Sequence, residues 1–225
     1  MGEARSGGRG AKAPPPTRLQ QYESYDRRLG ERAGLFAAVA EVVAVGCALY
    51  PGSYIDIGPS LVWADVTYVD NDRQAKRFFA SAGEVEHLIA AKQRYGGAAT
   101  IAYLGADYRG ALPLADGSFD LLISLYAGFV SEPCTRYLRP GGWLLANDSH
   151  GDASLAALDP RYRLVAVIDQ RVDGYTVTTG GLDAYLVPRR GIEVTAELLH
   201  RTGRGVTYTM APSAYLFQRL GRIGD

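Results

Sequence analysis

Short apolar runs alternate with helix-like segments through the middle of the chain. Each run is continuous and apolar, as expected of strands that helices cover on both faces of a sheet. The runs lie at residues 54–57, 66–69, 100–104, 120–125 and 143–147, and the helical segments at 73–80, 84–94 and 131–138. This alternation predicts a doubly wound, mostly parallel α/β sheet.

The two ends of the chain add to this sheet. Apolar residues recur at helical spacing from Tyr22 to Val45, which predicts an N-terminal helix that is broken near Gly34. After Asp152 a helix is expected at 153–158, and a second one at 194–201. The remaining apolar runs suit an antiparallel addition at the sheet edge and a closing segment; they lie at 162–168, 182–187 and 207–217.

The length of 225 residues fits one domain with its own core. Residues 1–20 carry glycine, arginine and a run of prolines, so we expect a flexible N-terminal tail followed by a single domain over 21–225. The two cysteines, Cys47 and Cys134, lie far apart in apolar surroundings, where a buried, reduced pair is expected; a disulfide or a nucleophile is the alternative.

The charges exclude some partners. Lysine and arginine number 24 and so do aspartate and glutamate, so the formal net charge is zero and no global field would gather nucleic acid. No apolar run has the length of a membrane span, and the N-terminus has no apolar signal segment. We therefore expect a cytoplasmic protein without a membrane partner, and a small molecule rather than a polynucleotide as substrate.

Polar residues gather where the predicted strands end. Ligands of open parallel sheets bind outside the carboxyl ends of the strands. Asp56 ends the first run and Asp70 the second, and a carboxylate at the second position can accept hydrogen bonds from ribose hydroxyls. The pattern indicates a site for an adenosine-bearing ligand, although aspartate is also common in loops and at helix N-caps.

Two further segments resemble a known family. Asp107 precedes the segment Leu-Ala-Asp-Gly-Ser-Phe-Asp at 114–120, and Leu-Arg-Pro-Gly-Gly at 138–142 leads into the fifth predicted strand. Over about residues 50–150 the chain resembles class I S-adenosylmethionine-dependent methyltransferases. The resemblance implies a Rossmann-like methyltransferase domain and S-adenosyl-L-methionine as cofactor.

The resemblance also implies roles for individual residues. Asp56 and Gly58 would stand at the methionine end of the cofactor, and Asp70 would hold the ribose hydroxyls. Asp107 would meet the adenine, with Tyr108 or Asn71 beside the ring. Ser124 and Tyr126, at the end of the fourth predicted strand, would face the methionine group or the substrate.

A further polar cluster follows the fifth predicted strand. His150 could act as a general base that takes a proton from a substrate hydroxyl or amine. With Asp148 and Asp152 it could instead bind a divalent metal, or the three could form a polar loop in which Asp152 caps the next helix. With three histidines in the chain and no Cys-x-x-Cys motif, we expect no metal site.

The chain departs from the family at the first crossover. Pro59, Ser60 and Leu61 follow Gly58, no glycine-rich turn is present, and the predicted strands lie too close for a full helix. We expect a crossover reduced to a turn, and a cofactor-pocket wall that is open or supplied by the helical segment before it or by a partner chain. A homodimer is one such arrangement.

Two other functions remain open on these grounds. The missing glycine turn favours a catalytically inactive methyltransferase-like protein that binds a partner or nucleotide. A nicotinamide-dependent oxidoreductase is disfavoured because the Gly-x-Gly-x-x-Gly phosphate turn is absent. Base-modifying members of the family carry an Asn/Asp-Pro-Pro-Tyr/Phe segment after strand four, where this chain has Ser-Leu-Tyr-Ala at 124–127. The resemblance therefore implies transfer to an O or N atom of a small molecule.

Overall fold

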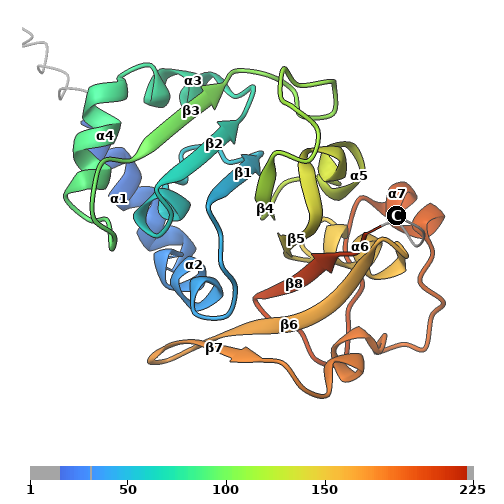
Figure 1. Cartoon of the computed structure of the whole chain (residues 1–225). Helices are drawn as coiled ribbons and strands as arrows, with labels where there is room; N and C mark the ends of the chain where they lie inside the picture. Colours follow the sequence, from blue (N-terminus) through green and yellow to red (C-terminus); the bar gives the residue numbers. More distant parts are fainter. Residues whose placement is uncertain (1–15, 31, 222–225) are drawn as a thin grey trace, which may run out of the picture.

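The computed structural model describes residues 16–30 and 32–221 of the chain. Eight strands form a single sheet in the order β3-β2-β1-β4-β5-β8-β6-β7 (Figure 1). The strands are β1 (Cys47–Pro51), β2 (Asp65–Val69), β3 (Thr100–Leu104), β4 (Phe119–Ser124), β5 (Leu138–Ala146), β6 (Tyr162–Arg171), β7 (Gly174–Thr178) and β8 (Ala214–Arg219).

Helices connect most of these strands. The α-helices are α1 (Arg18–Leu29), α2 (Ala33–Ala40), α3 (Arg73–Phe79), α4 (Ala82–Ala90), α5 (Ser131–Cys134), α6 (Asp152–Leu158) and α7 (Ala196–Thr202). Short 3-10 helices are η1 (Gly58–Leu61), η2 (Thr135–Tyr137) and η3 (Leu182–Leu186). In the described part of the chain, no helix is long and apolar enough to cross a membrane.

The sheet is parallel over its first five positions. β1 pairs in parallel with both β2 and β4, and β4 pairs in parallel with β5. β8 then runs antiparallel between β5 and β6, and β7 runs antiparallel to β6 at the far edge. Because the order reverses between β1 and β4, a ligand crevice is expected outside the carboxyl ends of these strands. The predicted doubly wound, mostly parallel sheet with an antiparallel addition is confirmed.

Each face of the sheet has its own core. On one face, Tyr22 of α1, Phe36 of α2 and Phe78 of α3 pack with strand side chains such as Tyr50 and Tyr68. On the other face, residues of α5, η2 and α6 cover β1, β4 and β5. The connection from β3 to β4 (residues 105–118) contains no helix, so this second face is not covered over β3, where Ala102 is exposed.

The first strand lies earlier than the sequence pattern predicts. β1 is Cys47–Pro51, whereas the predicted run 54–57 forms the turn that follows it. Tyr54 has φ 50°, which is incompatible with a strand. The true strand is bounded by Gly46 and Gly52, and its pairing with β2 is in register over all five residues. The crossover to β2 contains only η1, so the prediction of a turn in place of a full helix is confirmed.

The C-terminal and N-terminal predictions need smaller corrections. The run 182–187 is not a strand but largely the 3-10 helix η3, and the outer partner of β6 is β7, which follows the Val172-Asp173 turn directly. The break between α1 and α2 falls at Gly30 (φ 78°), not at Gly34. α1 already begins at Arg18, so residues 18–20 belong to a helix; residues 1–15 of the predicted tail lie outside the described residues.

Candidate functional site

One cavity lies at the carboxyl ends of β2 and β3. It has a volume of about 220 Å³ and is lined by Gly52, Asp70, Asn71, Ala106, Asp107, Tyr108 and Arg109. Four of the residues predicted to bind a cofactor therefore share one cavity: Asp70, Asn71, Asp107 and Tyr108. They come together because β2 and β3 are parallel neighbours in register, so the segments after them leave the sheet side by side.

Asp70 is held by backbone groups. The Tyr54 N–H donates to one carboxylate oxygen at 2.7 Å, and the Asp72 N–H donates to the other at 2.8 Å. A carboxylate has about four acceptor positions, so each oxygen keeps a lone pair for another donor. Asp70 is half-buried at the cavity wall. Its geometry is therefore that of an oriented acceptor with capacity left for two ligand hydroxyls.

Asp107 is paired with a neighbouring arginine. The Arg109 guanidinium donates to both carboxylate oxygens, at 2.9 Å to Oδ1 and 2.6 Å to Oδ2, and the Arg109 N–H also donates to Oδ1. The side-chain hydrogen bonds from Arg109 lower the pKa of Asp107 to about 2. The carboxylate is therefore ionised at neutral pH, with part of its acceptor capacity already used.

Tyr108 and Gly52 form the inner wall. The Gly128 N–H donates to the Tyr108 hydroxyl at 3.0 Å, which fixes the ring against the segment after β4. Gly52 has φ 67°, and a Cβ atom there would lie 2.5 Å from the Cβ of Ala127. Only glycine allows this approach. Neither Gly52 nor Arg109 was among the predicted site residues. The Pro51-Gly52 pair is a turn signal that could have marked the end of β1.

Asp56 and Gly58 do not line this cavity. Asp56 is 1% exposed and forms an ion pair with Arg32, with 3.1 Å between Arg32 Nη2 and Asp56 Oδ2. The Tyr50 hydroxyl and the Gly58 N–H also donate to its carboxylate. A Cβ atom on Gly58 would lie 2.8 Å from Phe36 of α2. The structure therefore places both residues beneath α2, inside the fold.

Arg32 connects the N-terminal helices to the ends of β1 and β4. Its guanidinium donates to the hydroxyls of Tyr25 (2.8 Å) and Tyr50 (3.3 Å), and it lies 5.0 Å from the centre of the Tyr126 ring. The guanidinium is buried, and its Nε has no hydrogen-bond partner. Sequence reasoning missed this residue, although an arginine just before an apolar helix was a possible signal. α2 thus packs against η1, the short helical turn of the crossover.

Ser124 also makes its contacts within the protein. Its hydroxyl donates to Asp152 at 2.5 Å, and Asp152 further accepts from the hydroxyl and N–H of Ser131 and from the N–H of Val130. Burial raises the pKa of Asp152 to about 6 despite these four donors. This buried carboxylate fixes the end of β4 to the beginnings of α5 and α6.

The two predicted catalytic residues are linked through Asn147. Its side-chain oxygen accepts from the N–H of Tyr126 at 3.1 Å and from the hydroxyl of Ser149 at 3.0 Å. The Ser149 hydroxyl is in turn 3.0 Å from Nδ1 of His150. Tyr126 is 55% exposed and has φ 57°, a strained backbone for a non-glycine residue. Both side chains are therefore exposed beyond the ends of β4 and β5.

The polar loop after β5 does not assemble a metal site. Asp148 accepts from Ser154 and from the Val206 N–H, whereas Asp152 faces Ser124 and Ser131. Within residues 16–30 and 32–221, no group of three acidic, histidine or cysteine side chains is placed to hold a metal ion. Both cysteines are free thiols, and burial raises the pKa of Cys134 to about 12.

Comparisons with known proteins give likenesses of fold. Neither protein-family models nor curated proteins match the sequence. Among solved structures, a methyltransferase from Geobacter sulfurreducens is 12% identical, with a TM-score of 0.47, over 93% of this chain and 92% of that chain. A SAM-dependent methyltransferase from Methanosarcina mazei is 14% identical, with a TM-score of 0.43, over 81% and 96%. The N-methyltransferase NodS from Bradyrhizobium japonicum is 13% identical, with a TM-score of 0.45, over 88% and 98%.

These values describe the chain topology alone, because a fold of this kind carries many activities. The sheet order and the parallel pairing are those of a doubly wound α/β domain. The protein has a doubly wound, Rossmann-like α/β fold.

Proposed function

We propose that the protein is an S-adenosylmethionine-dependent methyltransferase that acts on an O or N atom of a small molecule. One observation carries the proposal: Asp70, Asn71, Asp107 and Tyr108 line a single cavity at the carboxyl ends of two adjacent parallel strands. The sequence resemblance over about residues 50–150 supports the same function. S-adenosylmethionine supplies a methyl group that is activated by its sulfonium charge.

In this proposal the cavity would hold the nucleoside half of such a cofactor. Asp70 keeps acceptor capacity for the ribose hydroxyls, and Asp107 keeps part of its own for an amino group of the base. The volume of 220 Å³ is below the range of about 300–1,000 Å³ of small-molecule pockets, so the cavity holds part of the cofactor rather than all of it.

The acceptor would lie near Tyr126 and His150. Both are exposed beyond the strand ends and are linked to each other through Asn147 and Ser149. In this proposal the protein mainly aligns the reacting atoms, and His150 takes the proton when the nucleophile carries one.

A second candidate function rests on Asp56 and Gly58. Because α2 covers both residues, the positions that the resemblance assigns to the methionine end of the cofactor make their contacts within the protein instead. This arrangement favours a catalytically inactive relative that binds a nucleotide or nucleoside. The two candidates differ in what the methionine half of the ligand contributes to affinity.

Isothermal titration calorimetry can separate them. A methyltransferase is expected to bind S-adenosylhomocysteine at least about tenfold more tightly than adenosine, a difference of about 1.4 kcal/mol. Equal affinities would support the nucleotide-binding alternative. No heat and no thermal stabilisation with either compound at millimolar concentration would contradict both.

The Asp70→Ala variant tests the site itself. Losing charge-assisted hydrogen bonds to the ligand should weaken S-adenosylhomocysteine binding by about 1.5–3 kcal/mol, or about tenfold to a hundredfold. Asp65→Ala is the matched control, because Asp65 is exposed at the opposite end of the same strand. An unchanged affinity of the Asp70 variant, with its fold intact, would contradict the assignment.

A further inference from the structure

The edge of the sheet at β3 offers unpaired backbone groups. Among the residues that the structure describes, β3 pairs only with β2. The Thr100 N–H donates to the Ala64 carbonyl, and the Leu104 carbonyl accepts from the Asp70 N–H. The backbone N–H and C=O groups of the even-numbered residues of β3 therefore point toward β2. Because backbone groups alternate in direction along a strand, the N–H and C=O groups of Ile101 and Tyr103 point away from the sheet.

This edge lacks the features that usually prevent pairing. Edge strands are commonly protected by charged residues, proline or a bulge. β3 has the sequence Thr-Ile-Ala-Tyr-Leu, which contains none of these residue types, and its register with β2 is regular over all five residues. The face of β3 that carries Ala102 is also not covered by a helix. The strand is therefore competent to pair with another strand.

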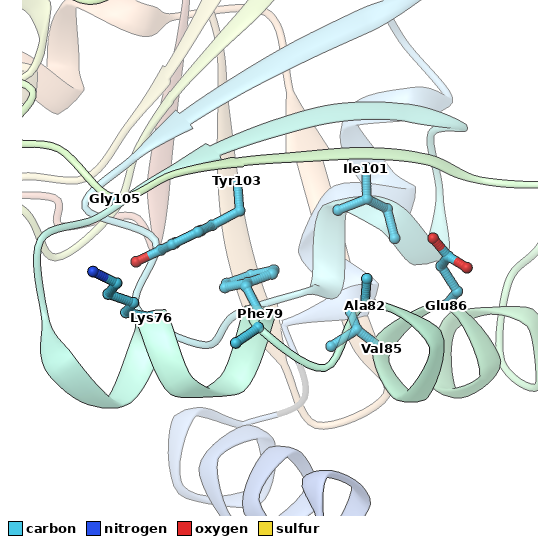
Figure 2. Close-up of a pocket in the computed structure, with 9 residues that line it drawn as sticks. Lys76, Phe79, Ala82, Val85, Glu86, Ile101, Tyr103 and Gly105 are labelled. Carbon is cyan, nitrogen blue, oxygen red and sulfur yellow. The ribbon is translucent and has the colours of Figure 1, made fainter.

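A cavity of about 540 Å³ lies beside the edge, between β3 and the helices α3 and α4. Its apolar lining includes Ile101, Val85 and Phe79, and the Tyr103 ring stacks on Phe79 with 4.6 Å between ring centroids. Figure 2 shows opposite charges at its two ends: Lys76 lies beside Tyr103 and Gly105, and Glu86 lies below Ile101. Among the described residues, neither Lys76 nor Glu86 has an ion-pair partner.

We propose that this surface, comprising β3 and the cavity beside it, is the interface of a homodimer in which two copies of β3 pair antiparallel about a two-fold axis at Ala102. Ile101 then lies opposite Tyr103 of the second copy, and the two residues exchange both backbone hydrogen bonds. Their side chains form an aromatic and β-branched cross-strand pair on the cavity side of the sheet, a favourable combination.

The residue on the axis fits this geometry. Ala102 would face Ala102 of the second copy as a non-hydrogen-bonded pair, in which Cα atoms lie only about 4.5 Å apart. A small side chain suits this close approach. Because the axis is perpendicular to the sheet, both copies present α3 and α4 on the same face of the continuous sheet.

The charges select a second copy as the partner. The two-fold rotation brings the Lys76 end of one cavity to the Glu86 end of the other, so the surface is complementary to itself. Two equivalent Lys76–Glu86 contacts form in one dimer. Parallel pairing of two β3 strands with the same sheet faces aligned would instead relate the copies by a translation, which does not close and which places like charges together.

A charge exchange tests this interface by sedimentation velocity and light scattering across micromolar concentrations. The unmodified protein should be dimeric. Lys76→Glu and Glu86→Lys should each raise the dissociation constant at least about tenfold, because each places like charges together twice. The double variant K76E/E86K should restore the dimer. A monomeric unmodified protein, single variants that dimerise normally, or a double variant that stays monomeric would each overturn the proposal.

A second variant acts on the axis rather than on the charges. Ala102→Lys places two ammonium groups opposite each other and should also yield a monomer. Thr176→Lys is the matched control, because Thr176 is exposed on β7, the other edge of the same sheet. Thermal unfolding confirms that both variants fold. A dimeric A102K protein, or a T176K protein that dissociates, would contradict an interface at β3.

Discussion

Two aspartates of this chain show how much a single contact decides. Asp70 and Asp56 both follow apolar runs, but only Asp70 lines a cavity. Asp56 is buried against Arg32, a residue of the distant N-terminal segment. The segments that precede the two carboxylates, Tyr54-Ile55 and Tyr68-Val69, are similarly apolar. Their difference arises from where α2 packs, which local pattern does not contain.

The buried pair predicts a large and specific stability effect. Arg32→Met or Asp56→Asn alone should reduce the free energy of unfolding by about 3–5 kcal/mol, because each leaves one buried partner unpaired. Urea denaturation measures the loss. The matched control is Asp116→Ala, which removes an exposed ion pair with Arg136 and should change stability by less than about 1 kcal/mol. Similar losses for the two pairs would contradict the buried role of Arg32.

At the scale of elements, a strand could be predicted where the apolar run in the sequence coincides with the strand itself. β2 and β3 are close to the predicted runs, and the residues after them meet in the cavity as predicted. β1 was misplaced because Tyr54 to Ile57 is as apolar as a strand although it forms a turn. The hairpin β6–β7 was missed in part because Gly174 to Thr178 mixes apolar and polar residues, none of which is fully buried. An edge strand that is only partly buried has a weak hydrophobic pattern in the sequence.

The turn after β1 gives a test at this scale. Gly52→Ala should reduce stability by about 2–4 kcal/mol, since alanine is strained at φ 67° and its Cβ would overlap Ala127. Gly181→Ala is the control, because Gly181 has φ 63° and open space around a Cβ atom. It should show the backbone cost alone, about 1 kcal/mol. Equal losses, read from chemical denaturation, would mean that the contact with Ala127 is not important.

At the scale of the whole molecule, the sequence indicated the class of fold and one half of the site. The sheet, its antiparallel addition and the shared cavity of Asp70 and Asp107 follow from strand order and register. The roles expected for Asp56, Gly58 and Ser124 could not be checked from sequence, because their partners Arg32, Phe36 and Asp152 are distant along the chain. Long-range polar contacts decide which strand-end residues stay open to a ligand.

Global stability should also record the buried carboxylate of Asp152. Its pKa rises from an ordinary 3.8 to about 6 in the folded protein. Between these pH values the folded chain keeps a proton that the unfolded chain has released, so this group's contribution falls as pH rises. The difference in unfolding free energy between the native protein and Asp152→Asn should therefore decrease by about 2 kcal/mol from pH 4 to pH 7. A difference that is constant with pH would show that Asp152 titrates normally.

The Tyr103 hydroxyl donates to the backbone carbonyl of Asp70 at 2.7 Å, so the outermost strand is tied directly to the carboxylate at the cavity wall. Asp107 lies only three residues beyond the end of this strand. A ligand that orders both carboxylates also restrains the outermost strand, and self-association restrains it from the other side. By thermodynamic linkage, ligand saturation should tighten self-association by the same factor by which self-association tightens ligand affinity.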